Sequence, residues 1–268
     1  MNWPPPLPKE HGSWAMLVVP LLTGLAVAPG WRWRALALLA AALGFFLLRF
    51  PLATLVKTRA RKNAARAEQL RWAAVCGGVT AISGGWLVVG QKLWGLAAMG
   101  AAGVLLVIFH LWLVARRREM SVAGQLAGIA GLALGAPMAC YTAAGVLNGT
   151  AALLWLANTL YFGGTVFYIK LKVRQQPRLP APERPVRRLL KARACLAYQT
   201  FALTVIILLV TLQKAPLLIP LAFAPATVKV LHGAWRWQDK KTLNLVRLGV
   251  TEIVHSVTFA ALVIGSFK

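Results

Sequence analysis

Long apolar segments recur along the chain, separated by short polar connections. Nine segments stand out, and most are near the ~20 residues that an α-helix needs to cross the hydrocarbon core of a membrane. They comprise residues 13–30, 35–56, 72–90, 94–115, 121–144, 150–172, 195–212, 214–233 and 245–267. Their apolar residues do not alternate as in barrel strands, and within lipid a helix satisfies its own backbone groups. The sequence therefore predicts an all-α, polytopic membrane protein with nine transmembrane helices.

Basic residues are concentrated in every second connection. Of the 30 Lys and Arg, 23 lie in residues 57–71, 116–118, 170–193 and 229–247. The opposite connections hold only Arg32, Arg34, Lys92 and Lys214. By the positive-inside rule, this asymmetry predicts that the N-terminus and the basic connections are cytoplasmic and that the C-terminus faces out.

Composition supports a single membrane domain that covers residues 1–268. The formal charge is +24, but 59% of the residues are hydrophobic, which leaves no room for a soluble basic domain and argues against a nucleic-acid partner. Residues 1–12 are expected to be an extended lead-in without signal-peptide features. Residues 173–194 form a basic cytoplasmic loop in which residues 187–191 suit a short surface helix. The cysteines, Cys76, Cys140 and Cys195, lack metal-ligand spacing, so neither a metal nor a cofactor is predicted.

The fifth apolar segment carries glycines at three- and four-residue spacing. These are Gly124, Gly128, Gly131 and Gly135. Small residues on one helix face let neighbouring backbones approach closely in a membrane, so we expect tight helix packing along this segment.

Polar residues inside the apolar segments are costly in hydrocarbon and normally face a bundle interior or a wet cavity. Arg49 lies eight residues before the cytoplasmic end of its segment, roughly 12 Å deep at 1.5 Å per residue. Glu252 lies at a similar depth, so an Arg49–Glu252 ion pair is one arrangement that neutralises both charges. His255 shares the helix face of Glu252. Two interpretations remain open. Either Lys170, Lys172 and Lys229 snorkel to the interface and the other polar residues make ordinary interhelical hydrogen bonds, or the set lines a polar cavity open to the cytoplasm. The set as a whole favours the cavity.

Local motifs add a family resemblance. Residues 112–117 end in Arg116-Arg117 and run into the glycine-rich residues 124–141. Together they resemble the YxxxKR element and fifth helix of the UbiA superfamily of intramembrane prenyltransferases. Residues 156–168 resemble the sixth helix of that superfamily. The resemblance implies a UbiA-like helical bundle whose cytoplasm-facing cavity binds an isoprenoid-type anionic ligand.

The chain departs from that superfamily at its metal sites. The prenyltransferases hold Mg²⁺ with carboxylates after helices 2 and 6, whereas residues 49–62 and 168–174 contain none here. We therefore expect cationic and polar side chains to bind the anion directly. The candidate substrate-binding residues are Arg49, Lys57, His110, Arg116, Asn158, Tyr161, Tyr168, Lys170, Lys172 and Lys229.

A second resemblance involves the two ends of the chain. Residues 8–16, which include Glu10 and His11, are similar to the opening of the YwiC-like family of bacterial membrane proteins, and residues 247–256 look like its last helix. This resemblance implies a bacterial inner (plasma) membrane location. Glu10, His11, Glu252 and His255 are candidate catalytic acids or bases. A capping and interfacial role is the alternative for Glu10 and His11.

Two hypotheses about function follow. In the first, the protein binds a phosphate-bearing or quinone-like membrane lipid, and its enzymatic version is a divergent, metal-independent prenyltransferase. In the second, it is a membrane transporter in which Arg49, Glu252 and His255 are coupling or gating groups.

Overall fold

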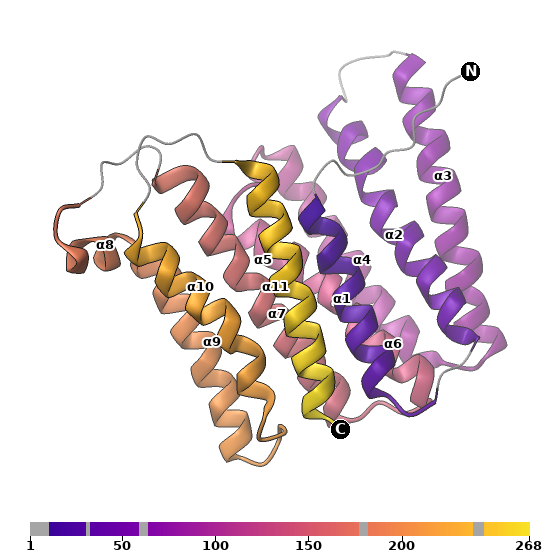
Figure 1. Cartoon of the computed structure of the whole chain (residues 1–268). Helices are drawn as coiled ribbons and strands as arrows, with labels where there is room; N and C mark the ends of the chain where they lie inside the picture. The colour runs from indigo at the N-terminus through magenta and orange to yellow at the C-terminus, as the bar shows by residue number, and fades with distance from the viewer. Residues whose placement is uncertain (1–10, 31–32, 59–63, 177–181, 238–243) are drawn as a thin grey trace. The chain divides into compact units, whose positions relative to one another are not determined.

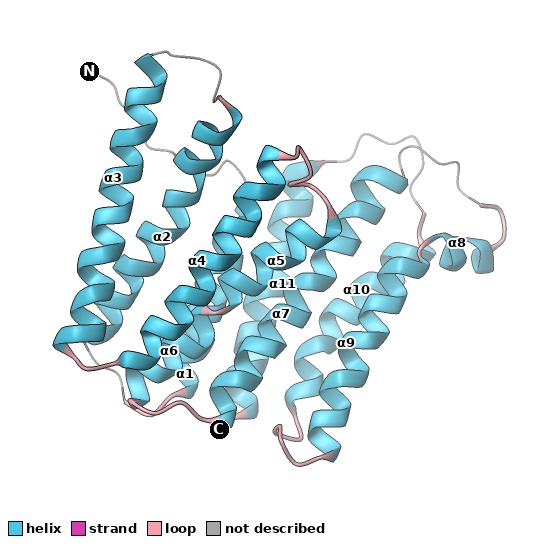
Figure 2. Cartoon of the chain, turned by 180° about the vertical axis from the view of Figure 1, so that it is seen from behind, coloured by secondary structure: helices cyan, strands magenta, loops and turns pink. Residues whose placement is uncertain are grey.

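The computed structural model describes residues 11–30, 33–58, 64–176, 182–237 and 244–268, and every regular element in these ranges is helical (Figure 2). Contacts between the elements divide the chain into two compact units, Met1–Trp155 and Leu156–Lys268. The helical content confirms the all-α prediction for the described residues. The single membrane domain of residues 1–268 stays a prediction.

The first unit packs its helices around a core of large apolar side chains. Its elements are α1 (His11–Val27), α2 (Arg34–Lys57), α3 (Ala64–Gly85), the π-helix η1 (Trp86–Gly90), α4 (Trp94–Ala115), α5 (Val122–Ala133) and α6 (Gly135–Ala144). Helices α2 and α3 lie side by side along their length (Figures 1 and 2), and α1 packs on α6. Leu17, Leu38, Phe46 and Leu87 are almost fully buried between them.

The fifth predicted span is broken into α5 and α6 at Leu134. Pro137 follows three residues later and has no N–H to donate to the carbonyl of Ala133, so the regular hydrogen-bond ladder is interrupted there. The N–H of Leu134 instead donates to Gly131, and helical bonding resumes from Met138 to Leu134. The two helices nevertheless form one apolar segment, Val122–Ala144, that is long enough to cross a membrane.

The second unit is built around α7 (Gly149–Ile169), whose first residues still belong to the first unit. The other elements are the π-helix η2 (Lys170–Gln175), α8 (Pro185–Lys191), α9 (Arg193–Thr211), the 3₁₀-helix η3 (Ile219–Phe223), α10 (Ala224–Trp235) and α11 (Leu245–Ser266). Helices α9 and α10 lie side by side (Figures 1 and 2). An aromatic group, Tyr161, Phe223 and Phe259, fills the core, with Tyr161 stacked on Phe259 at 3.9 Å between ring centroids.

Seven helical segments among the described residues are long and apolar enough to cross a membrane. This confirms a polytopic helical protein at the level of length and composition. The first predicted span is helical, but α1 has only 17 residues and is shorter than these seven segments. The eighth predicted span divides into η3 and the 12-residue α10. Much of the predicted connection 57–71 is also helical, since α3 already begins at Ala64. Ala, Arg, Glu and Gln favour helix there. The short surface helix near residues 187–191 is confirmed as α8.

Candidate functional site

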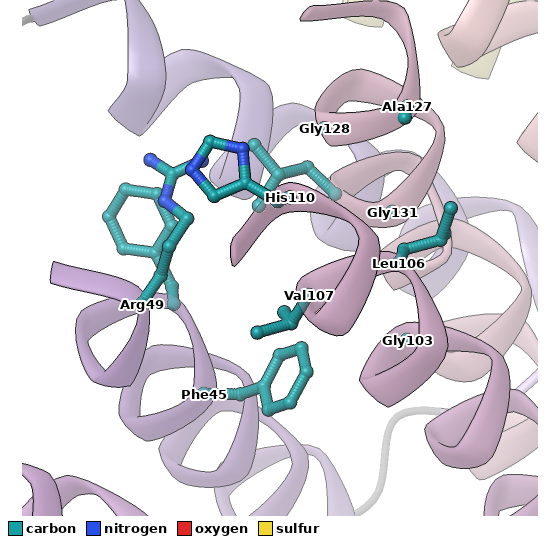
Figure 3. Close-up of a pocket in the computed structure, with 11 residues that line it drawn as sticks. Phe45, Arg49, Gly103, Leu106, Val107, His110, Ala127, Gly128 and Gly131 are labelled. Carbon is teal, nitrogen blue, oxygen red and sulfur yellow. The ribbon is translucent and has the colours of Figure 1, made fainter. Parts of the chain in front are cut away.

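A small pocket lies in the first unit between α2, α4 and α5 (Figure 3). Its lining is Phe45, Phe46, Arg49, Gly103, Leu106, Val107, His110, Ala127, Gly128, Gly131 and Leu132. The volume is about 50 Å³. This space holds a few water molecules or one end of a ligand, because a whole drug-sized ligand needs at least ~300 Å³. We call it the α2–α4–α5 pocket.

Two predicted ligand residues meet at this pocket. Arg49 reaches it from α2 and His110 from α4, and both side chains extend to the same side of it in Figure 3. The guanidinium of Arg49 lies over the rings of Phe46 and Phe50, at 5.3 and 4.9 Å from their centroids. Such cation–π contacts stabilise a cation in apolar surroundings. The pocket therefore joins an apolar wall to two basic side chains.

The glycines of α5 and the glycine that begins α6 have different surroundings, and two of them, Gly128 and Gly131, line the pocket. A Cβ added to Gly124 would lie 2.9 Å from a methyl carbon of Leu113, and one added to Gly135 would lie 3.1 Å from Leu21. These two positions confirm the tight packing predicted for the segment. A Cβ added to Gly128 would meet nothing within 4 Å. Gly128 therefore borders open space and leaves room for the pocket.

Two other predicted ligand residues of the first unit do not line the pocket. Lys57 donates a 2.8 Å hydrogen bond from Nζ to Glu119, in an ion pair that is largely solvent-exposed. The guanidinium of Arg116 lies 5.4 Å from the ring centroid of Trp112. The first contact links the end of α2 to the connection between α4 and α5, whereas the second lies within the C-terminal end of α4.

A buried polar stripe runs along one face of α7 and η2 in the second unit. Its members recur every three or four residues and are at most 8% exposed: Asn158, Tyr161, Thr165, Tyr168, Lys172 and Gln176. This spacing puts them on one helix face, and 18 residues at 1.5 Å per residue give a length of roughly 27 Å. The polar face of α7 thus points into the unit. Sequence reasoning did not identify Thr165 or Gln176, although their spacing from the other members was a usable signal.

The stripe adjoins a buried ion pair between α10 and α11. Nζ of Lys229 lies 2.9 Å from both carboxylate oxygens of Glu252, and both side chains are less than one-tenth exposed. Nζ of Lys229 also lies 4.8 Å from the ring centroid of Tyr168. Snorkelling is therefore wrong for Lys229. Arg49 belongs to the first unit, so an Arg49–Glu252 pair stays a prediction, and the partner that the structure gives to Glu252 is Lys229.

Lys172 is also buried, and snorkelling is wrong for it as well. Its ammonium donates to Oε1 of Gln176 at 3.0 Å and to the carbonyl oxygen of Gly233 at 3.2 Å. Nε2 of Gln176 donates to the same carbonyl at 2.8 Å. Lys170, two residues earlier, is only partly buried. The two predicted ligand lysines of this segment thus have different environments.

Two of the predicted catalytic residues, Glu252 and His255, lie on the same helix, α11. His255 is partly buried on α11, three residues from Glu252. Glu10 lies outside the described residues, and of His11 the structure describes the backbone, as the first residue of α1. The part of the chain that the structure describes contains no group of three His, Cys, Asp or Glu side chains that could hold a metal ion.

Long apolar helices, basic connections and polar faces turned inward define a multi-pass α-helical membrane protein. The chain belongs to the YwiC-like protein family, whose model matches residues 7–140. It is 25% identical over 175 residues to a Bacillus subtilis (strain 168) protein named "Uncharacterized protein YwiC", with 63% of this chain and 68% of that protein covered. No solved structure matches the chain.

Proposed function

We propose that this protein binds an amphipathic anion, a phosphate-bearing or quinone-like membrane lipid, in the α2–α4–α5 pocket. The observation that carries the proposal is the meeting of Arg49 and His110 with an otherwise apolar wall. A guanidinium suits an anionic or strongly polar head group, and the apolar wall suits the carbon atoms next to it.

The proposed topology places this pocket within reach of the cytoplasmic leaflet. We propose that nine helical segments cross a bacterial plasma membrane as a UbiA-like bundle, with the N-terminus in the cytoplasm. The basic connections support this orientation, because positive charge is retained on the cytoplasmic side. Lys57 and Arg116 then lie at the cytoplasmic ends of α2 and α4. Positive charge at these ends attracts anionic lipids toward the pocket.

Pocket size limits how a ligand is held. A volume of about 50 Å³ takes the head of a lipid and not its chains. The acyl chains of the lipid then remain in the surrounding bilayer, so binding does not move them out of an apolar environment. Binding at such a site depends on the head group and on the small side chains that leave room for it.

Equilibrium binding of phosphatidic acid in nanodiscs tests the proposal. Arg49→Gln removes the cation, and Gly128→Leu fills the pocket at a position where a Cβ meets nothing within 4 Å. We expect each change to weaken binding by about 10-fold. Arg49→Gln removes a charge-assisted hydrogen bond to the head group, and Gly128→Leu removes the space that the head group occupies.

Two matched variants control for charge and helix composition. Arg118→Gln removes an exposed cation, and Gly100→Leu fills open space on α4 outside the pocket lining. Both should bind as the unaltered protein does. Equal loss in the pocket variants and the controls, or no loss in either, would contradict the proposal.

A second candidate function is transport, which the buried Lys229–Glu252 pair favours. Buried ion pairs in membrane helices commonly mark ion or substrate pathways. In this version Lys229, Glu252 and the nearby His255 take the coupling role that the sequence suggested for Arg49, Glu252 and His255. Uptake of labelled phosphate by proteoliposomes tests it, with Glu252→Gln as the inactive control. Absence of uptake at every imposed pH gradient would remove this candidate.

A further inference from the structure

Among its described residues, the second unit buries more basic than acidic side chains. Two ammonium groups, Lys172 and Lys229, and one carboxylate, Glu252, are each less than one-tenth exposed. Lys229 holds both oxygens of Glu252, whereas Lys172 donates only to neutral oxygens, on Gln176 and Gly233. Among the described residues, this buried cluster therefore carries one positive charge more than it neutralises.

An uncompensated buried charge is costly, and buried charges in proteins are normally paired or hydrogen-bonded to an opposite charge. We propose that Lys172 is a second anion-binding site, separate from the α2–α4–α5 pocket, and that it takes the phosphate group of a dissolved or lipid-borne ligand. The inference does not rest on the proposed function, because it uses other residues in the other unit.

Hydrogen-bond donors from α7 and η2 lie close together beside Gly233 of α10. The ammonium of Lys172 has three N–H donors, of which two are used by Gln176 and Gly233. A Cβ added to Gly233 would lie 3.2 Å from both Cε of Lys172 and the hydroxyl oxygen of Tyr168. The Tyr168 hydroxyl is therefore a neighbour of Lys172 and a second donor for an anionic oxygen. Lys229, 4.8 Å from the ring centroid of the same tyrosine, adds positive potential.

Backbone geometry singles out the same place. Lys172 lies in the π-helix η2, where the N–H of Gln176 donates to the carbonyl of Leu171, five residues back, at 3.0 Å. Short π-helical insertions are rare and occur frequently at functional sites. Arg188 of α8 donates to the carbonyl of Trp235, the last residue of α10, and the neighbouring Arg187 is exposed. These cations near the end of α10 attract anions toward Lys172.

The structural alternative is that Lys172 only caps α10. Its acceptor, the Gly233 carbonyl, belongs to the last turn of α10, and cations stabilise helix C-termini. The alternatives differ in one measurable respect. A cap affects folding and leaves phosphate affinity unchanged, whereas a ligand residue changes phosphate affinity.

Titration of the purified full-length protein with sodium phosphate, followed by calorimetry, tests the inference. An Arg49→Gln background removes the contribution of the pocket. We expect Lys172→Gln to weaken phosphate binding by at least about 10-fold, because one charge-assisted hydrogen bond in a dry site is lost. The matched control Arg174→Gln removes an equal charge two residues away from an exposed position, and it should change affinity by less than about twofold.

Lys172→Arg keeps the charge and guards against failure to fold. It should retain phosphate binding if Lys172→Gln cannot be purified as a monodisperse protein. A parallel titration with phosphatidic acid in nanodiscs separates the two sources of the phosphate group. A Lys172 effect seen with the lipid alone supports a head-group site, and an effect seen with sodium phosphate supports a site for the dissolved ion.

Three results would overturn the inference. These are equal affinities in Lys172→Gln and Arg174→Gln, no binding of either probe in the Arg49→Gln background, or loss of binding in Lys172→Arg without loss of folding. Failure here leaves the effects of Arg49→Gln and Gly128→Leu on lipid binding untouched, so the two proposals are judged separately.

Discussion

Nζ of Lys229 lies 2.9 Å from each carboxylate oxygen of Glu252, and this contact joins α10 to α11 inside the second unit. The side chains are 6% and 9% exposed. In the first unit, the Lys57–Glu119 pair has a similar distance of 2.8 Å but exposures of 52% and 29%. Equal geometry thus occurs in very different dielectric surroundings, and the consequences for stability differ accordingly.

Glu252→Gln should destabilise the protein strongly, because it leaves the ammonium of Lys229 buried without its counter-charge. We expect a loss of about 3–5 kcal/mol in the free energy of unfolding, by analogy with other broken buried pairs. The double variant Glu252→Gln with Lys229→Met should recover part of this loss, since the buried charge is then removed. Unfolding in mixed micelles measures both values.

The exposed pair is the control for that experiment. Glu119→Gln should cost less than about 1 kcal/mol, because solvent screens the Lys57–Glu119 interaction. Strict additivity of the Glu252 and Lys229 changes would show that the two side chains do not interact as described.

Gly24→Ala should destabilise the contact between α1 and α6. A Cβ on Gly24 would collide with the carbonyl oxygen of Ala136 and lie 2.8 Å from Cβ of Ala139, so the helices would have to separate. We expect a cost of about 1–3 kcal/mol, typical of overpacking. Gly78→Ala, on α3, is the matched control, since a Cβ there meets nothing within 4 Å. It should be neutral or stabilise by up to about 1 kcal/mol through helix propensity. Equal midpoints for thermal unfolding of both variants would refute the close approach.

Removal of divalent cations should leave lipid binding unchanged. No carboxylate lies in residues 49–62 or 168–174, so we expect Arg49 and the nearby basic groups to bind the proposed anion without a bridging Mg²⁺. Phosphatidic acid should therefore bind nanodisc-embedded protein equally well in EDTA and in Mg²⁺. A requirement for Mg²⁺ would show that the head group is held through a metal. Added salt should weaken binding modestly, through screening of the exposed basic residues.

Cysteine accessibility should reveal opposite sidedness for the two sets of connections. Arg66→Cys, Arg118→Cys and Arg187→Cys replace exposed residues near basic connections, and Val146→Cys replaces an exposed residue in a connection without Lys or Arg. A membrane-impermeant maleimide should label Val146→Cys in intact cells and the other three only after permeabilisation. The native cysteines are buried and give little background. Labelling of all four positions from one side would contradict the nine-span topology.

Part of the candidate site was predictable from the sequence because spacing along one helix determines which residues share a face. Asn158, Tyr161, Tyr168 and Lys172 were identified individually as polar residues within apolar segments, and the structure puts them on one buried stripe. Arg49 and His110 were also identified, and both line the α2–α4–α5 pocket. Partners on other helices were not predictable in this way. Lys229 is 23 residues from Glu252 in sequence, and nothing in the spacing favours it over Arg49.

The sequence by itself determined that this protein is helical and polytopic, because runs of apolar residues near the length of a bilayer leave the backbone no other partner than itself. It also determined membership of the YwiC-like family, whose model matches residues 7–140. Only the tertiary structure decided that Lys229 neutralises Glu252, that Lys172 is buried beside Gly233, and that Gly128 borders open space while Gly124 does not. These outcomes depend on how each helix is rotated about its axis and packed on its neighbours, which apolar composition and spacing within one helix leave undetermined.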